Sequence, residues 1–96
     1  MSKFEQAKLL MKARKLQKEL QHEIITVDVG DGAVKIEITG EQKIKRIAID
    51  SERVNLDDIG ELERWLEEAV REAISRSQRL AAEKMQPMMG ALSGMM

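Results

Sequence analysis

The helices that this sequence predicts are much longer than its strands. Apolar spacing favours two helices of about 20 and 30 residues on either side of strands of about six. At 1.5 Å per helical residue and 3.3 Å per strand residue, helices of roughly 30 and 45 Å extend past a sheet of roughly 20 Å. The projecting parts still carry apolar stripes. We therefore predict a second subunit that covers them, and the parts that project become the candidate working surface.

The first helix is predicted from Ser2 to Glu23, a segment without Gly or Pro. Leu9, Ala13, Leu16 and Leu20 are spaced four, three and four residues apart, which places them on one helical face. A basic stripe runs beside this apolar stripe. The candidate DNA-binding side chains of the segment are Lys3, Lys8, Lys12, Arg14, Lys15 and Lys18.

The middle of the chain predicts three antiparallel strands. Ile24 through Val29 is rich in β-branched residues, and 30–32 (Gly-Asp-Gly) is typical of a tight turn. In 34–39, aliphatic and polar residues alternate, which gives one apolar and one polar sheet face. Ile44 falls out of phase with the later isoleucines, so we expect a bulge near Lys45-Arg46 in the third strand. The predicted fold is α+β, in the order α-β-β-β-α with an antiparallel meander.

The second helix is predicted to begin after Asp58, where Glu61 completes a capping pattern, and to end at Pro87. Residues 1–87 then form a single domain, and 88–96 form a flexible Met-rich tail. The broad apolar face of the helix is the predicted dimer interface. Its residues are Leu62, Trp65, Leu66, Ala69 and Ala73.

Composition narrows the class of protein. The 96 residues include 16 basic and 17 acidic side chains, and the positive charge is concentrated in residues 1–23, which carry six Lys or Arg against three Glu. Without cysteine there is no disulfide, thiolate metal site or thiol nucleophile. We find no signal-peptide pattern and no stretch near the 18 or so apolar residues of a membrane span. We expect a soluble intracellular protein with no membrane association.

The sequence predicts neither an enzyme nor a cofactor site. His22, the only histidine, is interpreted as a helix-terminal residue, and one His without Cys makes no typical zinc site. Asp57 and Asp58 are interpreted as helix caps and not as ligands of a hard cation. The glycine pair in 30–32 precedes a strand, whereas phosphate-binding glycine motifs precede a helix.

Charge on the first helix is the strongest functional indication. Lysines and an arginine on a projecting helix, doubled by a second subunit, would neutralise several phosphates of double-stranded DNA, although a basic stripe is also typical of a solvated face. Phe4 and Trp65 are the only aromatic residues, and both are interpreted as packing residues. Base stacking is therefore not expected, and lysines give little base recognition, so DNA binding should be weakly selective.

Several segments together resemble the YbaB/EbfC family of bacterial nucleoid-associated proteins. The front helix 6–17 (QAKLLMKARKLQ), the stretch 32–40 (GAVKIEITG) and the strand 44–50 (IKRIAID) are similar to family segments. Segments 62–66 (LERWL) and 69–73 (AVREA) resemble its helix signature, with Arg64-Trp65 and Arg71-Glu72 as departures. The resemblance implies a tweezer-like homodimer that binds duplex DNA with low sequence preference. It also implies a role in chromosome organisation or gene regulation, in the cytoplasm and on the nucleoid.

A protein-interaction adaptor is the alternative function. Met88, Met89, Met95 and Met96 would then form an adaptable contact with replication or recombination machinery, since unbranched thioethers fit many shapes. A frayed chain end is the simpler interpretation of the same residues. DNA binding by the wild-type chain separates the two functions.

Overall fold

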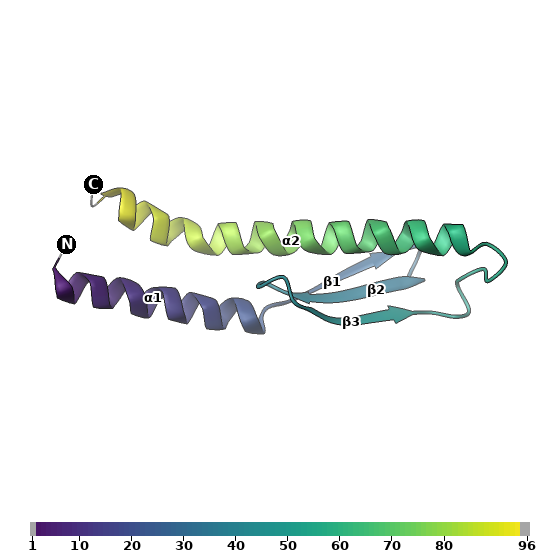
Figure 1. Ribbon diagram of the computed structural model, residues 1–96, viewed down its shortest axis with the longest axis horizontal. Coiled ribbons are helices and arrows are strands. Elements are labelled where there is room, and N and C mark those ends of the chain that lie inside the picture. The colour runs from purple at the N-terminus through teal and green to yellow at the C-terminus, as the bar shows by residue number, and fades with distance from the viewer. Residues whose placement is uncertain (1, 95–96) are drawn as a thin grey trace.

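Two helices and three strands form the chain. A computed structural model describes residues 2–94, with side chains for residues 2–90 (Figure 1). In chain order the elements are α1 (Lys3–His22), β1 (Ile24–Val29), β2 (Val34–Thr39), β3 (Ile44–Ile49) and α2 (Ile59–Gly94). The sheet order is β1-β2-β3 with both pairs antiparallel. The predicted α-β-β-β-α fold and its meander are confirmed.

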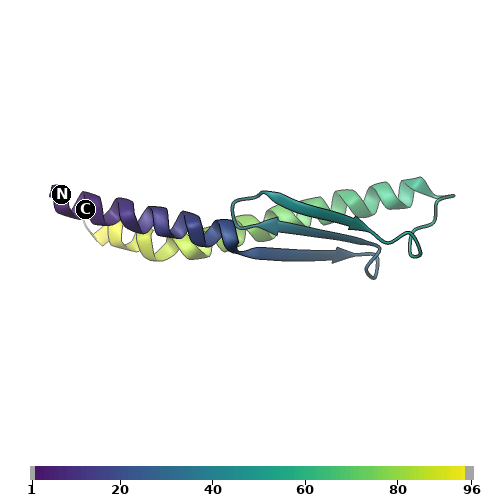
Figure 2. The same ribbon diagram turned by 90° about the horizontal axis from the view of Figure 1, so that it is seen from below.

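The molecule is long and narrow. Its extents are 64 × 20 × 15 Å and its radius of gyration is 18.5 Å, compared with about 12.5 Å for a compact domain of this length. The first half of α2 covers one face of the sheet, and its second half runs beside α1 beyond the sheet (Figures 1 and 2). We call residues 2–22 and 75–94 the arm and residues 23–74 the body. Both ends of the chain lie at the far end of the arm.

The start of α1 is fixed by a capping box. Ser2 Oγ accepts a hydrogen bond from the Glu5 backbone N–H at 3.2 Å, and Glu5 Oε2 accepts one from Ser2 N at 3.4 Å. Two of the N–H groups that a helix leaves unpaired at its N-terminus are satisfied in this way. The predicted helix is therefore confirmed to within a residue of each end.

The hairpins follow the predicted register. Val27 pairs with Ile36, and Glu37 pairs with Arg46, but Ile38 pairs with Ile44. Lys45 is consequently the extra residue of a β-bulge, as the change of phase among the isoleucines predicts. The first turn has positive φ at Gly30, where a Cβ atom would lie 2.9 Å from the Trp65 ring. Trp65 thus packs directly on the turn, as expected of a packing residue.

The core lies between α2 and the sheet. Val27, Ile36 and Ile38 point toward α2 and are fully buried, and Ala69 and Ala73 of α2 are buried against them. Alanines at this contact let the helix approach the sheet closely, which suits a core made of few side chains. The body is held together by this single layer of aliphatic groups.

The arm is joined to the body at the end of β2. Ser77 Oγ, buried in α2, donates a hydrogen bond to the Thr39 carbonyl oxygen at 2.7 Å. The Gly40 backbone N–H donates to the Leu20 carbonyl oxygen at 2.9 Å. A Cβ atom at Gly40 would lie 2.8 Å from Leu20 Cδ2, so only glycine permits this close approach of α1 to the sheet.

The prediction that α2 ends at Pro87 is wrong, because α2 continues through Pro87 to Gly94. Proline removes one intrahelical hydrogen bond and bends a helix, and Figure 1 shows α2 changing direction toward its C-terminal end. Pro87 and Met88 line a groove with Leu9 and Leu16 of α1, so packing against α1 supports the helix on both sides of the proline. The segment 88–94 is helical, and Met95 and Met96 lie outside the described residues. The flexibility of the 88–96 tail stays a prediction.

The apolar stripe of α1 is covered by its own chain. Leu9, Ala13 and Leu16 are half-buried and Leu20 is buried, because the second half of α2 runs alongside them. Part of the cover that we expected from a second subunit therefore comes from the same chain, and the second subunit itself stays a prediction. Sequence periodicity identified the stripe but did not identify the helix that packs on it.

Candidate nucleic-acid interface

All six predicted DNA-binding side chains lie on α1 and are exposed. They are Lys3, Lys8, Lys12, Arg14, Lys15 and Lys18. Among the side chains of residues 2–90, none of the six takes part in a salt bridge; the pairs present involve Arg53, Arg71, Arg76 and Lys84. Their charge is available to a polyanion.

The spacing of these cations suits a phosphate backbone. Lys3 and Lys18 are fifteen residues apart, which corresponds to about 22 Å along a helix. This length spans roughly six base-pair rises of duplex DNA. One α1 therefore presents its cations over about half a turn of B-form DNA.

The second half of α2 adds to the positive charge of the arm. Arg79 is exposed, Arg76 pairs with Glu72 at 2.8 Å, and Lys84 pairs with Glu23 at 3.5 Å. The arm as a whole carries nine basic and three acidic side chains, a net charge of +6. The body carries seven basic and fourteen acidic side chains, a net charge of −7. The sequence-based predictions did not identify that the acids of the second helix nearly end at Glu72.

Phe4 is not a packing residue. Its side chain is 71% exposed on α1, and the ammonium group of Lys8 lies 5.3 Å from the centre of its ring. Met11, two helical turns further on, is 70% exposed. Within the chain, the interpretation of Phe4 as a packing residue is wrong, because the apolar stripe of α1 passes on the other side of the helix.

The residues predicted for the dimer interface have different environments. Ala69 and Ala73 are fully buried within the chain, so they have no surface to offer a second subunit in this conformation. Leu62, Trp65 and Leu66 are half-buried at the margin of the core. The interface itself stays a prediction.

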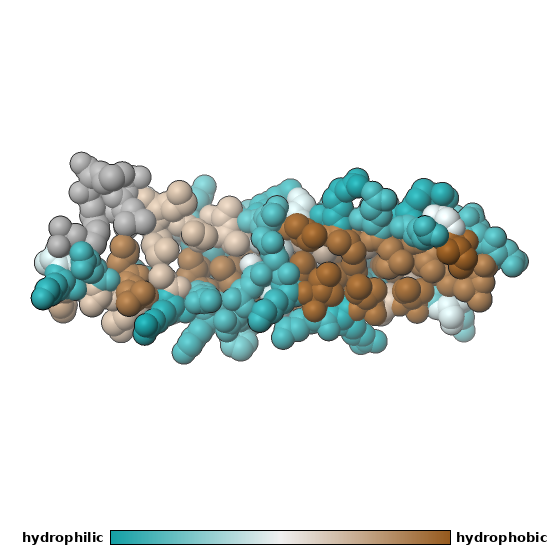
Figure 3. Space-filling model, viewed as in Figure 1, coloured by the Kyte–Doolittle hydropathy of each residue, from teal (hydrophilic) through white to brown (hydrophobic). Residues whose placement is uncertain are grey.

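A different apolar surface is uncovered on the body. Three isoleucines of β3 lie on the same sheet face as the buried side chains of β2: Ile44, Ile47 and Ile49. Each is 44 to 46% exposed, because α2 covers β1 and β2. Figure 3 shows the resulting apolar band between α2 and β3. Ile59 and Ile74 of α2 are also exposed. Sequence alternation predicted the face of these isoleucines but not that they would lack a partner.

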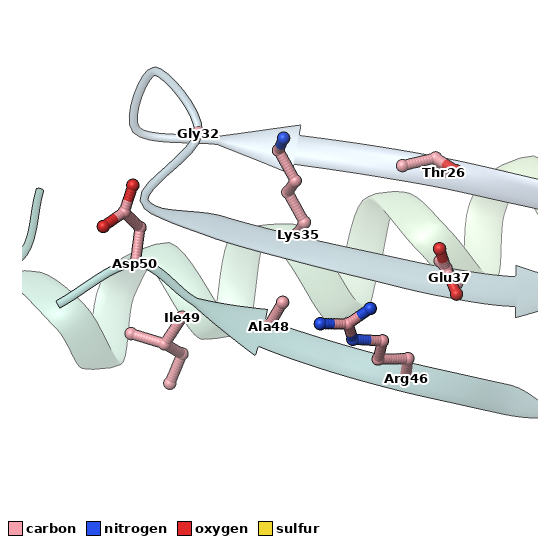
Figure 4. Close-up of a pocket in the computed structure, with 8 residues that line it drawn as sticks. All are labelled: Thr26, Gly32, Lys35, Glu37, Arg46, Ala48, Ile49 and Asp50. Carbon is pink, nitrogen blue, oxygen red and sulfur yellow. The ribbon is translucent and has the colours of Figure 1, made fainter.

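The open face of the sheet carries mixed charge. Thr26, Lys35, Glu37 and Arg46 line a shallow hollow of about 410 Å³ there (Figure 4). Glu37 faces Arg46 across the strands, so opposite charges alternate on this surface. This pattern is typical of a solvated sheet face.

His22 and Asp58, which were considered from the sequence as catalytic or metal-binding residues, lie at the ends of helices. His22 is exposed at the end of α1, and Asp58 Oδ1 accepts a hydrogen bond from the Glu61 backbone N–H at 3.2 Å as a helix cap. Within the part of the chain that the structure describes, no group of His, Asp or Glu is arranged to hold a metal ion. In the same part, no helix is long and apolar enough to cross a membrane.

Fold and charge together define a small α+β protein with a meander body and an arm of two helices. The chain belongs to the YbaB/EbfC DNA-binding family, whose family model matches residues 1–92. The resemblance predicted from the front helix, the strands and the second helix is therefore confirmed.

Similar proteins agree with this assignment. A nucleoid-associated protein of Chloroflexus aurantiacus is 35% identical over 82 residues, which are 85% of this chain and 82% of that protein. A nucleoid-associated protein of Ruminiclostridium cellulolyticum is 38% identical over 81 residues, 84% of this chain and 70% of that protein. The crystal structure of an uncharacterized Helicobacter pylori protein matches with a TM-score of 0.78 at 17% identity, over 86% of this chain and 87% of that one. The last similarity supports the fold alone.

Proposed function

We propose that this protein binds double-stranded DNA as a homodimer, with low sequence preference, through the cations of α1. Its place is then the nucleoid in the bacterial cytoplasm, and its role is chromosome organisation or gene regulation. The observation that carries the proposal is the set of six exposed cations without salt-bridge partners on a helix that projects from the body. The names of the relatives and of the family support the same function.

Binding of this kind rests on the release of counterions from DNA. If about four to six phosphates are contacted, log affinity falls with log salt concentration with a slope of roughly −4 to −5. Lysine is a point charge on a flexible stem, so contacts of this type distinguish bases poorly. The acidic body is repelled by DNA, which favours contact through the arm alone.

Surface area supports the homodimer. The single chain exposes 7151 Å², whereas a compact monomer of this mass exposes about 5,600 Å². The excess is larger than the roughly 800 Å² that each partner contributes to an interface of standard size. The apolar band of Ile44, Ile47 and Ile49 beside α2 is the surface that we assign to the second copy, with Leu62 and Leu66 at its margin.

The decisive experiment compares two charge-reversed variants with the wild type on unrelated duplexes across a salt series, by fluorescence anisotropy. The arm variant replaces Lys8, Lys12 and Lys15 by Glu. Its control replaces Lys35 and Lys45 of the sheet and Lys43 of the turn before β3 by Glu, which changes the net charge equally. We expect the arm variant to bind at least about tenfold more weakly with a shallower salt slope, and the control to bind nearly as the wild type does. Equal losses in both variants would contradict a site on the arm.

One observation favours the alternative function of a protein-interaction adaptor. Met85 and Met89 are exposed on the arm, where they are available to a partner protein. An adaptor would leave random duplexes unbound at low salt concentration. If the wild-type protein bound no duplex at 50 mM salt, DNA binding would be rejected in favour of the adaptor function.

A further inference from the structure

The outer side of α1 carries an apolar ridge that its fold does not use. Leu9 and Leu16 face α2, whereas Phe4 and Met11 are about 70% exposed. With 3.6 residues per turn, positions 4, 7 and 11 fall on one line on the side opposite the covered stripe. We call Phe4, Ala7 and Met11 the ridge.

Cations flank the ridge on both sides. The same helical geometry places Lys8, Lys12 and Lys15 along one flank and Lys3 and Arg14 along the other. Lys8 lies against the Phe4 ring, with its ammonium group 5.3 Å from the ring centre, so a charge stands directly beside the apolar surface. The ridge therefore lies between two rows of cations. This arrangement suits a ligand that has two rows of anionic groups with less polar groups between them.

We propose that α1 enters the major groove of duplex DNA, with the ridge against base edges and the two cation rows toward the phosphates of opposite strands. This inference rests on the proposed function and specifies its binding mode. In the major groove the apolar groups available to Phe4 and Met11 are the thymine methyl groups. The ligand is therefore duplex DNA in which thymine methyl groups strengthen binding to a modest degree.

The dimensions agree with this groove. A helix with its side chains is about 10 to 12 Å wide, and the major groove is about 12 Å wide, whereas the minor groove is only about 6 Å wide. α2 packs on the side of α1 that faces away from the ridge, so it stays outside the groove. α1 can thus approach the base edges along its exposed length.

The alternative ligand for a basic helix with apolar groups is an anionic lipid surface. A helix lying in that surface buries a broad apolar face along its length. On α1 the line of the ridge continues into Lys18 and His22, and the ridge contains only two large apolar side chains. The charge pattern therefore favours DNA over lipid.

The test uses two duplexes of one sequence, one with thymine and one with deoxyuridine in every thymine position. The two have the same phosphates and the same hydrogen-bonding groups, and they differ in the methyl groups. We expect the wild-type protein to bind the deoxyuridine duplex about three- to fivefold more weakly, the effect of roughly one lost methyl contact. The salt slope is expected to be equal on both duplexes, because no charge changes.

Two variants assign this preference to the ridge. Phe4→Gln with Met11→Gln keeps the charges and uses a good helix former, so it should bind both duplexes equally with an unchanged salt slope. Met85→Gln with Met89→Gln alters exposed methionines on the other helix of the arm and should keep the wild-type preference. Far-UV circular dichroism before binding verifies that α1 is intact in each variant.

The outcomes separate the inference from the proposed function. Equal binding of the two duplexes by the wild type, with a steep salt slope, overturns the major-groove mode and leaves DNA binding in place. Absence of binding to both duplexes overturns the proposed function itself. Displacement by the minor-groove ligand netropsin, or a preference that persists in the ridge variant, also overturns the inference. Tight binding to phosphatidylglycerol vesicles without preference between duplexes assigns the ridge to lipid and overturns it as well.

Discussion

The body and the arm differ in how they use apolar side chains. Among the described side chains, every fully buried aliphatic group belongs to the body, where one helix packs on one sheet face. The seam between α1 and α2 in the arm consists mainly of half-buried residues such as Leu9 and Leu16, and Leu20 is buried where α1 meets the body. Stability is therefore concentrated in the body, and the arm depends on its attachment to the body.

The two regions also differ in how they use charge. On the body, Arg71 pairs with Glu67 one helical turn away, and acids outnumber bases two to one. On α1 the cations greatly outnumber the acids and form no salt bridge among residues 2–90. The comparison teaches that nearly equal numbers of basic and acidic side chains can conceal two regions of opposite net charge. The acidic region contains most of the core, and the basic region is available to a ligand.

Removing a core side chain should produce the largest difference between the regions. Ile36→Ala is expected to lower the free energy of unfolding by about 3 kcal/mol, because it leaves a cavity between α2 and the sheet. Leu10→Ala on the exposed side of α1 should change it by less than about 0.5 kcal/mol. Urea unfolding followed by circular dichroism measures both. Similar losses in the two variants would show that the arm is part of the core.

The turn beneath Trp65 should be the next most sensitive position. Gly30→Ala is expected to cost about 1 to 3 kcal/mol, because the residue has φ of +68° and a Cβ atom would press on the indole ring. Tryptophan fluorescence during urea unfolding reports both the stability and the ring's environment. Gly60→Ala is the control: its Cβ would meet only ordinary contacts in α2, so it should be neutral or stabilising. Equal stability of Gly30→Ala and wild type would argue against this turn geometry.

The joint between arm and body should be less sensitive. Ser77→Ala is expected to cost about 1 kcal/mol through the lost hydrogen bond to the Thr39 carbonyl oxygen. The loss is moderate because the Gln42 backbone N–H also donates to that oxygen, at 3.0 Å. Ser75→Ala, exposed on the same helix, should be neutral or slightly stabilising through the higher helix propensity of Ala, so the difference between the two variants measures the hydrogen bond. Thermal unfolding distinguishes the two, and identical curves would mean that the buried hydroxyl does not hold the arm.

The ion pair across the same joint should have the smallest effect. Glu23→Gln removes the partner of Lys84 and is expected to cost no more than a few tenths of a kcal/mol, because both side chains are substantially exposed. Glu83→Gln, a nearby exposed acid without a salt bridge among residues 2–90, serves as its control. A loss above about 1 kcal/mol for Glu23→Gln alone would make this pair a principal tie between the regions.

Local patterns predicted the elements well. The glycine-free stretch with leucines at helical spacing predicted α1, and the alternation in 34–39 predicted β2. The phase of Ile44 predicted a bulge near Lys45-Arg46, because side-chain parity in a strand is fixed by its geometry, and the structure places the extra residue at Lys45. The basic stripe was placed on the correct helix and is exposed, although its contact with DNA stays a proposal.

Long-range packing accounts for what the sequence did not predict. The continuation of α2 beyond Pro87 depends on α1, a segment some 70 residues away in the chain. Burial of Ala69 within the chain and exposure of Phe4 depend on which faces of the two helices meet. Periodicity identifies an apolar face, but the partner of that face is decided by the whole fold.

The common position of the two chain ends has a practical consequence. Lys3 and Gly94 both lie at the far end of the arm, so any polypeptide fused before one or after the other is carried beside the cationic helices. A fluorescent reporter attached at either terminus would crowd the surface that we assign to DNA. Insertion in the exposed 51–57 loop, at the opposite end of the molecule, would keep such a reporter clear of that surface.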